Sequence, residues 1–163
     1  AKPNPAHLKL AELEKADKLK AVITQNIDGL HQKAGSKNVL ELHGSIHRNY
    51  CEFCKREYDL DFILKSEGIP RCECGGIVKP DVVLYEESLN NDVLSSSINY
   101  IANADTLIIG GTSLVVYPAA ELINYFNGSK LVLINKSETP YDNLASLVIN
   151  EAIGETLEQI KIK

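Results

Sequence analysis

Apolar runs alternate with amphipathic stretches along this chain, and their order predicts an α/β fold. Short apolar runs bounded by polar or glycine-containing turns are typical of buried strands. Apolar residues spaced three or four apart, beginning after Asn or at Pro, indicate helices. The predicted strands and extended segments are 20–25, 38–44, 80–85, 106–110, 130–135 and 146–150, and the predicted helical segments are 5–18, 28–34, 94–104, 117–126 and 155–163. Because strands and helices alternate, we expect a parallel sheet.

One segment interrupts this alternation. Between Tyr50 and Pro80, cysteines, charged residues and the pair Gly75–Gly76 replace the apolar runs. We therefore expect a small module over residues 47–79, inserted in a main domain that is made of residues 1–46 and 80–163.

The four cysteines of this segment are candidate metal ligands. Cys51-x2-Cys54 is followed, after 17 residues, by Cys72-x-Cys74, and two close thiol pairs suit a tetrahedral zinc site. The second pair is one residue shorter than the usual C-x2-C, but the glycines that follow it can relax the turn. Two disulfides are the alternative in a secreted protein. The first ten residues contain no continuous apolar signal segment, which favours the metal. Four thiolates leave no position for water, so this zinc would be structural.

Composition narrows the classes of function. The net charge is -5 and no run of Lys or Arg exceeds two, so the sequence lacks the basic surface that nucleic acids and anionic membranes select. No apolar run approaches the roughly 20 residues that span a bilayer. We expect a cytoplasmic protein whose 44% apolar content is enough for a core.

Polar residues follow two of the predicted strands. The stretch "VITQNIDG" ends a buried strand with Gln25, Asn26 and Asp28, and strand ends are where ligands bind in open α/β sheets. The strand 106–110 runs into Gly111, Thr112 and Ser113, a loop whose N–H groups and hydroxyls could approach a phosphate or a ribose. The same residues are also ordinary loop chemistry.

His43, in "ELHGS" at the end of the segment 38–44, is a candidate general base. The spacing alone leaves His31 and His47 equally available. His7 lies in the first predicted helix and is expected to be inert.

Together these segments resemble the sirtuins, the NAD-dependent protein-lysine deacylases, and the bacterial-type enzymes in particular. The resemblance covers roughly residues 3–153 and rests on "PNPAH", "VITQNIDGLHQKAGSKNVLELHGS", the paired cysteines, "CGGIVKPDVVLYEE", "GGTSLVVYPAA" and "VLIN". The most specific part is "TQNIDGLH" followed by "LHG".

The resemblance implies the sirtuin fold, a Rossmann-like parallel sheet with an inserted zinc-ribbon module, and two cofactors, NAD and Zn²⁺. It implies that His43 is the catalytic base, which takes a proton from a ribose hydroxyl of NAD. The reaction would remove an acyl group, with acetyl as the expected case, from a protein lysine and yield nicotinamide and O-acyl-ADP-ribose. The acylated lysine of a protein would be the substrate, and the full-length enzyme would be a monomer.

The resemblance also implies binding roles. Val83, Leu84 and Tyr85 match the extended segment that lines the acyl-lysine tunnel and pairs with the substrate backbone. The positions that match residues contacting NAD are Gln25, Asn26, Asp28, Gly111, Thr112, Ser113, Asn135, Ala152 and Ile153.

The sequence departs from the sirtuin pattern in two places. The Gly-Ala-Gly turn and "PDFR" motif of the family do not occur, so we expect this chain to be the C-terminal portion of a longer one. Strands 20–25 and 106–110 would then each have an unpaired edge, and the isolated chain would misfold or bind NAD poorly. Glu86 stands where the family has Gly, and its side chain either alters the substrate groove or points to solvent.

Two other functions are compatible with these residues. One is mono-ADP-ribosyl transfer from the same NAD site, although the presence of His43 favours deacylation. The other is a catalytically silent scaffold that carries a zinc-ribbon binding module.

Overall fold

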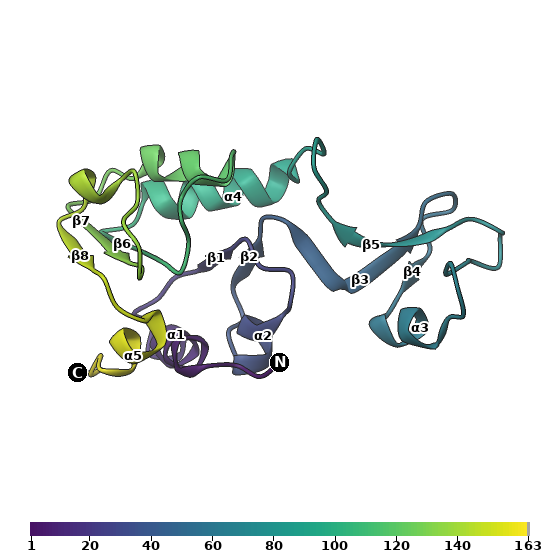
Figure 1. The fold of residues 1–163 in the computed structure, drawn as a ribbon, viewed down its shortest axis with the longest axis horizontal. Helices are drawn as coiled ribbons and strands as arrows, with labels where there is room; N and C mark the ends of the chain where they lie inside the picture. The colour runs from purple at the N-terminus through teal and green to yellow at the C-terminus, as the bar shows by residue number, and fades with distance from the viewer. Residues whose placement is uncertain (163) are drawn as a thin grey trace. The chain divides into compact units, whose positions relative to one another are not determined.

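The computed structural model describes residues 1–162, which form two compact units (Figure 1). The first unit contains residues 1–23 and 30–40 and the chain from Asn91 onward. The second contains residues 24–29 and 41–90, and it is therefore wider than the module predicted over 47–79. Each unit has its own sheet and its own small core. The predicted α/β character is present, with parallel strands in the first unit.

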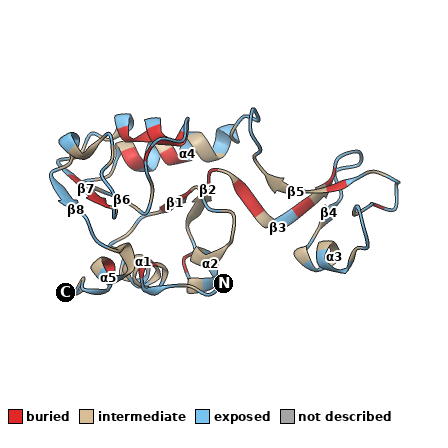
Figure 2. Cartoon of the chain, in the orientation of Figure 1, coloured by how far each residue is buried: buried red, intermediate tan, exposed pale blue. Residues whose placement is uncertain are grey.

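Three parallel strands form the sheet of the first unit, in the order β6-β7-β8. These strands are β6 (Thr106–Gly110), β7 (Lys130–Ile134) and β8 (Leu147–Ile149), and all three lie within predicted strands. β7 is the central strand and is the most deeply buried, with Leu133 and Ile134 almost fully enclosed (Figure 2). Aliphatic and β-branched residues fill these runs, as is typical of strands, although Ile108 of β6 and Leu147 and Val148 of β8 are exposed.

The start of the first helix is fixed by its N-cap residue. α1 (Pro5–Lys15) begins after Asn4, whose side chain accepts the N–H of His7 at 3.1 Å, with Pro5 in the first turn. α1 packs beside α5 (Ile153–Glu158), and together with β7 they enclose the core residues Ala6, Ile134 and Leu157. α5 begins two residues before the predicted start at 155 and ends at Glu158, short of the predicted end at 163, a residue that lies outside the described part of the chain.

The remaining helices of the first unit are short, apart from α4 (Asn91–Ala102), and comprise α2 (Leu30–Ala34), η1 (Ala119–Tyr125) and η2 (Asp142–Leu144). η1 is a 3-10 helix, whereas the sequence pattern predicted a regular helix over 117–126. Its buried residues pair three apart, Ala119 with Leu122 and Ala120 with Ile123, which matches the three residues per turn of a 3-10 helix.

A separate two-stranded sheet pairs β1 (Val22–Thr24) with β2 (Val39–Glu41). The predicted strand 38–44 ends at Glu41, because Leu42 and His43 turn the chain into the next strand. Within residues 1–162, β1 pairs with β2 alone and β6 with β7 alone. The open edges predicted for strands 20–25 and 106–110 are therefore present in the described chain.

The second unit is built on an antiparallel sheet in the order β4-β3-β5. Its elements are β3 (Gly44–Cys51), β4 (Glu57–Tyr58), α3 (Leu60–Lys65) and β5 (Val78–Val82). Asp59 caps α3 by accepting the N–H of Phe62 at 2.8 Å. The sequence pattern did not predict β3, β4 or α3. A small core surrounds Cys51, Cys72 and Val78.

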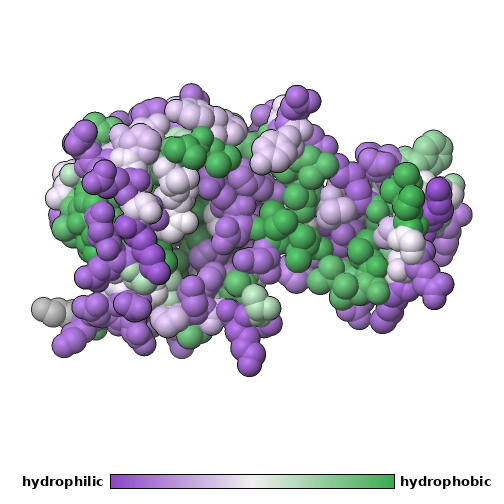
Figure 3. Space-filling model, in the orientation of Figure 1, coloured by the Kyte–Doolittle hydropathy of each residue, from purple (hydrophilic) through white to green (hydrophobic). Residues whose placement is uncertain are grey.

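Figure 3 shows hydrophobic patches on the surface of the molecule. The large apolar and aromatic residues of the second unit that are exposed are Phe53, Leu64, Ile69, Ile77, Leu84 and Tyr85. Across residues 1–162, none of the helices has the length and apolar content that a bilayer crossing requires.

Candidate functional site

The predicted zinc ligands come together in the second unit. Cys51 ends β3, Cys54 lies in the following turn, and Cys72 and Cys74 lie in the loop before β5. All four Sγ atoms lie within 4.8 Å of one another, and the Cys51–Cys74 and Cys54–Cys72 pairs are 3.5 Å apart. Tetrahedral zinc with bonds of about 2.3 Å separates its sulfurs by roughly 3.8 Å. The four free thiols therefore fit zinc, and they do not form the alternative disulfides.

The ionisation of these cysteine thiols also favours a bound cation. The neighbouring Tyr58 hydroxyl and the backbone N–H of Cys74 favour the thiolate of Cys72 and lower its pKa to about 6. The Gly76 N–H acts to lower the pKa of Cys74, but hydrogen bonding with Cys72 and Cys51 raises it to about 12. Neighbouring thiols thus cannot all ionise together unless a positive charge lies among them. A dication would compensate all four thiolates.

His43 lies in the tight turn between β2 and β3 and is half-buried. Its Nδ1 is 3.0 Å from the carbonyl oxygen of Gln25. A carbonyl oxygen can only accept, so Nδ1 carries the proton, and in the neutral ring Nε2 keeps its lone pair. The backbone oxygen of His43 accepts the N–H of Val83 at 3.0 Å. His43 is therefore held by two predicted binding segments of the same unit, through its ring by Gln25 and through its backbone by Val83.

The loop after β1 holds the polar strand end. Asn26 is exposed and its N–H donates to Thr24 Oγ1 at 3.1 Å. The Nε2 of His47 donates to the backbone oxygen of Asp28 at 3.1 Å. His43 and His47, which the spacing left equivalent, therefore have different hydrogen-bond partners. The third, His31, lies in α2 of the first unit, where its ring contacts that of His7 at a centroid distance of 4.6 Å.

A cavity of about 460 Å³ lies in the first unit, at the carboxyl ends of β6 and β7. Four of the predicted NAD residues line it, namely Gly111, Asn135, Ala152 and Ile153. Thr112 and Ser113 follow in the same loop but do not line it. Its lining also includes residues that the sequence analysis did not assign to NAD, namely Asn4, Pro5, Ile134, Lys136, Glu151, Gly154 and Glu155.

The cavity surface is mostly apolar, with polar groups from residues such as Asn4, Asn135 and Glu151, and this suits the adenosine part of a dinucleotide. Asn135 is oriented by donation from its Nδ2 to the Ser137 oxygen at 2.8 Å. Gly110 lets the chain pass close to Ile153, because a Cβ at position 110 would lie 2.2 Å from Ile153 Cδ1. Ile153 lines the cavity, and the absence of a side chain at Gly110 leaves room for it. Ligand cavities at strand ends are the rule in α/β sheets.

The predicted substrate segment leaves β5 as an exposed turn. Val83 is half-buried, whereas Leu84 is 59% exposed and Tyr85 fully exposed. The Glu87 carboxylate accepts the Leu84 N–H at 2.9 Å and pairs with Lys79 at 3.2 Å. These contacts, the Leu84 N–H first and Lys79 second, lower the pKa of Glu87.

Glu86 lies in the same turn, with φ at +70° and an exposed side chain. Non-glycine residues rarely adopt this conformation. The backbone shape expected of the family's glycine is therefore retained at a position that carries a carboxylate.

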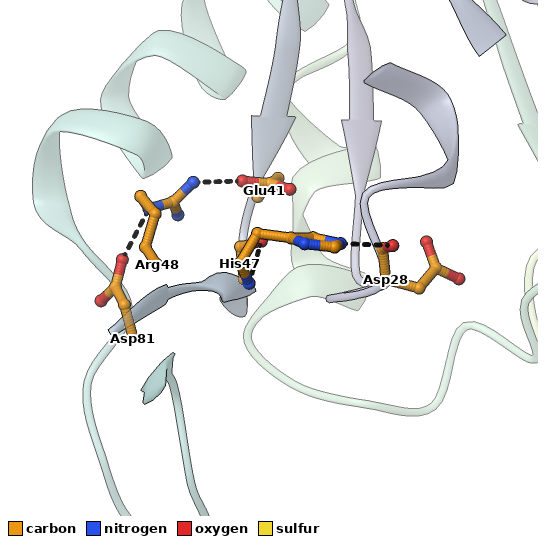
Figure 4. A network of polar contacts seen from close by, with 6 residues as sticks. Asp28, Glu41, His47, Arg48 and Asp81 are labelled. Carbon is orange, nitrogen blue, oxygen red and sulfur yellow. Dashed lines mark hydrogen bonds and ion pairs between the residues drawn. The ribbon is translucent and has the colours of Figure 1, made fainter. Parts of the chain in front are cut away.

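Sequence reasoning missed one charged cluster in the second unit. Arg48 of β3 contacts Glu41 and Asp81, which lie on β2 and β5 (Figure 4). The only signal in the sequence was an acidic residue, Glu41, within an otherwise apolar strand.

Comparison with known proteins identifies the family. Residues 1–118 match the model of the Sir2 family. The chain is 65% identical over 162 residues to an NAD-dependent protein deacetylase of Clostridium acetobutylicum, a match that covers 98% of this chain and 66% of that protein. It is 53% identical over 161 residues to an NAD-dependent protein deacetylase of Cutibacterium acnes, which covers 99% of this chain and 66% of that protein.

Solved structures agree with these sequence matches. A Sir2 protein bound to a peptide and NAD⁺ superimposes with a TM-score of 0.91 at 45% identity, covering 98% of this chain and 69% of that one. A Sir2 protein bound to acetylated peptide gives a TM-score of 0.92 at 44% identity, with 98% and 69% covered. The chain spans 64–66% of the length of the first curated relatives that it matches. The predicted sirtuin fold is confirmed, and this chain belongs to the Sir2 family.

Proposed function

We propose that this protein removes acyl groups, acetyl in the first instance, from protein lysines in an NAD-dependent reaction that yields nicotinamide and O-acyl-ADP-ribose. Relatives with 65% identity are named NAD-dependent protein deacetylases. Similar solved structures contain acetylated peptide, propionylated peptide or 2′-O-acetyl-ADP-ribose. The observation that carries the proposal is the histidine geometry: Nδ1 of His43 is fixed on the Gln25 carbonyl, so Nε2 is free to act as a base.

The chemistry needs both a cavity and a base. An amide oxygen is a poor nucleophile, so it reacts only when it is held against an electrophilic carbon. NAD⁺ would supply that carbon, in its nicotinamide ribose, together with a leaving group. The cavity lined by Gly111, Asn135 and Ile153 would hold the adenosine part. Gln25, Asn26 and Asp28 would contact the nicotinamide ribose and nicotinamide. His43 Nε2 would accept a proton from a ribose hydroxyl.

The substrate would bind along the exposed turn. An acylated peptide would add its backbone to the extended Val83–Tyr85 segment, as in other cases of strand addition. Leu84 and Tyr85 offer exposed apolar area for the acyl-lysine side chain. Zinc bound by the four cysteines would hold the second unit together without taking part in the reaction. We also propose the cytoplasm as the compartment, because four free thiols suit a reducing environment.

The test is to incubate the protein encoded by the complete gene with acetylated peptide and NAD⁺, and to measure nicotinamide and deacylated peptide. His43→Ala should reduce turnover by about 10²–10⁴-fold, the usual contribution of a general base, while bound zinc stays at one ion per chain. His7→Gln is the control, because Gln can replace His7 in the capping box of α1 and should leave turnover unchanged.

Other outcomes would favour the competing functions. Transfer of ADP-ribose to protein without deacylation would indicate a mono-ADP-ribosyltransferase. Zinc binding with no consumption of NAD⁺ would indicate a silent binding module. Turnover that survives His43→Ala would remove His43 from its proposed role.

A further inference from the structure

Strand β3 bulges next to the predicted site. On β5 the consecutive residues Asp81 and Pro80 pair with Ser45 and Asn49 of β3, so residues 46–48 have no opposite partners in the ladder. Bulges redirect side chains and are frequent beside active sites. Here the bulge carries His47, which reaches the Asp28 loop, and Arg48, which reaches two other strands.

Arg48 joins two carboxylates that come from different strands. Its Nη1 donates to Glu41 Oε2 at 2.6 Å and its Nε donates to Asp81 Oδ2 at 3.0 Å (Figure 4). The Glu41 side chain is only 7% exposed, whereas those of Arg48 and Asp81 are 54% and 47% exposed. A carboxylate as buried as that of Glu41 is costly unless a cation pairs with it. Arg48 therefore has one strong inner contact and one weaker outer contact.

The charges of the trio support each other. Partial burial acts to lower the pKa of Arg48, but the hydrogen bonds to Glu41 and Asp81 outweigh burial and raise it. The planar guanidinium directs N–H groups along separate edges, so one side chain can hold two partners at once. A lysine ammonium in the same position is a point charge and lacks this fixed fork.

The two carboxylates lie just ahead of the two functional segments. Glu41 precedes His43 by two residues, and Asp81 precedes Val83 by two residues. The segments meet where the Val83 N–H donates to the His43 oxygen at 3.0 Å. The Arg48 bridge thus runs beside the backbone hydrogen bond that joins His43 to the start of the proposed substrate segment.

We propose that Arg48 is a positioning residue, which holds Asp81 and the Val83–Tyr85 segment in register with the turn that carries His43. The role in catalysis rests on the deacylase function proposed above. The peptide substrate is bound productively only when this segment keeps its place beside His43, so loss of the bridge acts mainly on peptide binding.

The decisive variant is Asp81→Asn, because it weakens the outer contact and leaves Arg48 paired with buried Glu41. In the protein encoded by the complete gene, it should raise KM for acylated peptide about 2–5-fold, the value of one exposed ion pair, with kcat within about two-fold. KM for NAD⁺ should not change. The matched control is Lys65→Ala, which breaks an exposed ion pair with Asp61 on α3 of the same unit and should leave every constant unchanged.

Two variants of Arg48 extend the test. Arg48→Ala should raise KM for peptide about ten-fold or more, because it also removes the cation that faces the buried Glu41 carboxylate. Arg48→Lys should give an intermediate KM, since it restores the charge without the fork. The double variant Arg48→Ala/Glu41→Gln no longer has a buried charge. Its melting temperature should therefore return toward the wild-type value, while its KM for peptide stays as high as in Arg48→Ala. Recovery of both together would reduce Arg48 to a structural role and overturn the proposal.

Hydrogen exchange separates failure of this proposal from failure of the proposed function. The Val83 amide should exchange faster in Asp81→Asn and Arg48→Ala than in the wild type, whether or not the protein deacylates anything. If the wild type is active and both variants keep the wild-type KM and Val83 protection, Arg48 does not position the segment. If the wild type is inactive but Val83 protection falls as expected, the bridge stands and the deacylase function fails.

Discussion

Gly44 follows the proposed base directly, and its conformation is one that other residues avoid. Its φ is +76°, and a Cβ there would lie 1.9 Å from the backbone oxygen of Asp81. Both the backbone strain and the close approach of β5 therefore require glycine. The "HG" of the "LHG" motif has a physical reason: the turn that presents His43 passes against β5, the strand that leads to the proposed substrate segment.

Gly44→Ala should lower the free energy of unfolding of the second unit by more than about 2 kcal/mol, since strain and a clash with backbone act together. Denaturant unfolding of the zinc-loaded protein, followed by tyrosine fluorescence, measures this loss. Gly68→Ala is the control: Gly68 has a similar φ of +73° but open space around its Cβ, so only the strain of about 1 kcal/mol remains. Equal losses in the two variants would show that the contact with Asp81 is unimportant.

At the scale of elements, the turn between β5 and α4 depends on the ionisation of Glu87. Its carboxylate accepts the Leu84 N–H, and this contact and Lys79 lower its pKa below the ordinary 4.5. A group whose pKa is lowered by folding stabilises the folded turn above its unfolded pKa and loses that contribution as the pH falls through the folded value. The substrate turn should therefore be fully ordered at neutral pH and loosen only in acid.

An NMR titration of the Leu84 amide should show this loosening with a midpoint below pH 4.5. In Glu87→Gln the amide should lose this transition, because no carboxylate is left to titrate. A midpoint at or above 4.5 in the wild type would show that the Leu84–Glu87 hydrogen bond does not favour the charged form.

At the scale of the whole molecule, each of the two units has a core of a different kind. The core of the first unit consists of Ala6, Ile134 and Leu157, with further aliphatic residues packed against them. The second has two of the predicted zinc ligands, Cys51 and Cys72, in its core beside Val78. A core that consists partly of metal ligands depends on the metal, whereas an aliphatic core does not.

Removal of zinc with a chelator should therefore unfold the second unit selectively. Amides such as those of Cys51 and Cys72, which donate to the Arg56 and Gly76 oxygens, should lose their protection from hydrogen exchange. Amides of β7 should keep their protection from exchange, and added zinc should restore the protection of amides in the second unit. Loss of protection in both units to the same extent would contradict this division, and full protection without metal would show that zinc is dispensable.

The sequence by itself determined most elements of the first unit and the clustering of the four cysteines. Strands such as β6 and β7 follow from local apolar runs, and α1 follows from Asn4 and Pro5 at its start, because these signals act between residues close in the chain. The cysteine spacing predicted the cluster for the same reason, since each pair is held within one short turn.

Only the tertiary structure decided which histidine has which partner, where the cavity lies and that Arg48 links Glu41 with Asp81. His43 and His47 are equivalent by spacing, and they differ because one reaches Gln25 and the other Asp28, across 18 and 19 residues. The cavity likewise joins Asn4 to Ile153, from opposite ends of the chain. Local sequence patterns do not predict such pairings. Long-range contacts depend on strand register, on the bulge in β3 and on packing, and not on which residues are neighbours in the sequence.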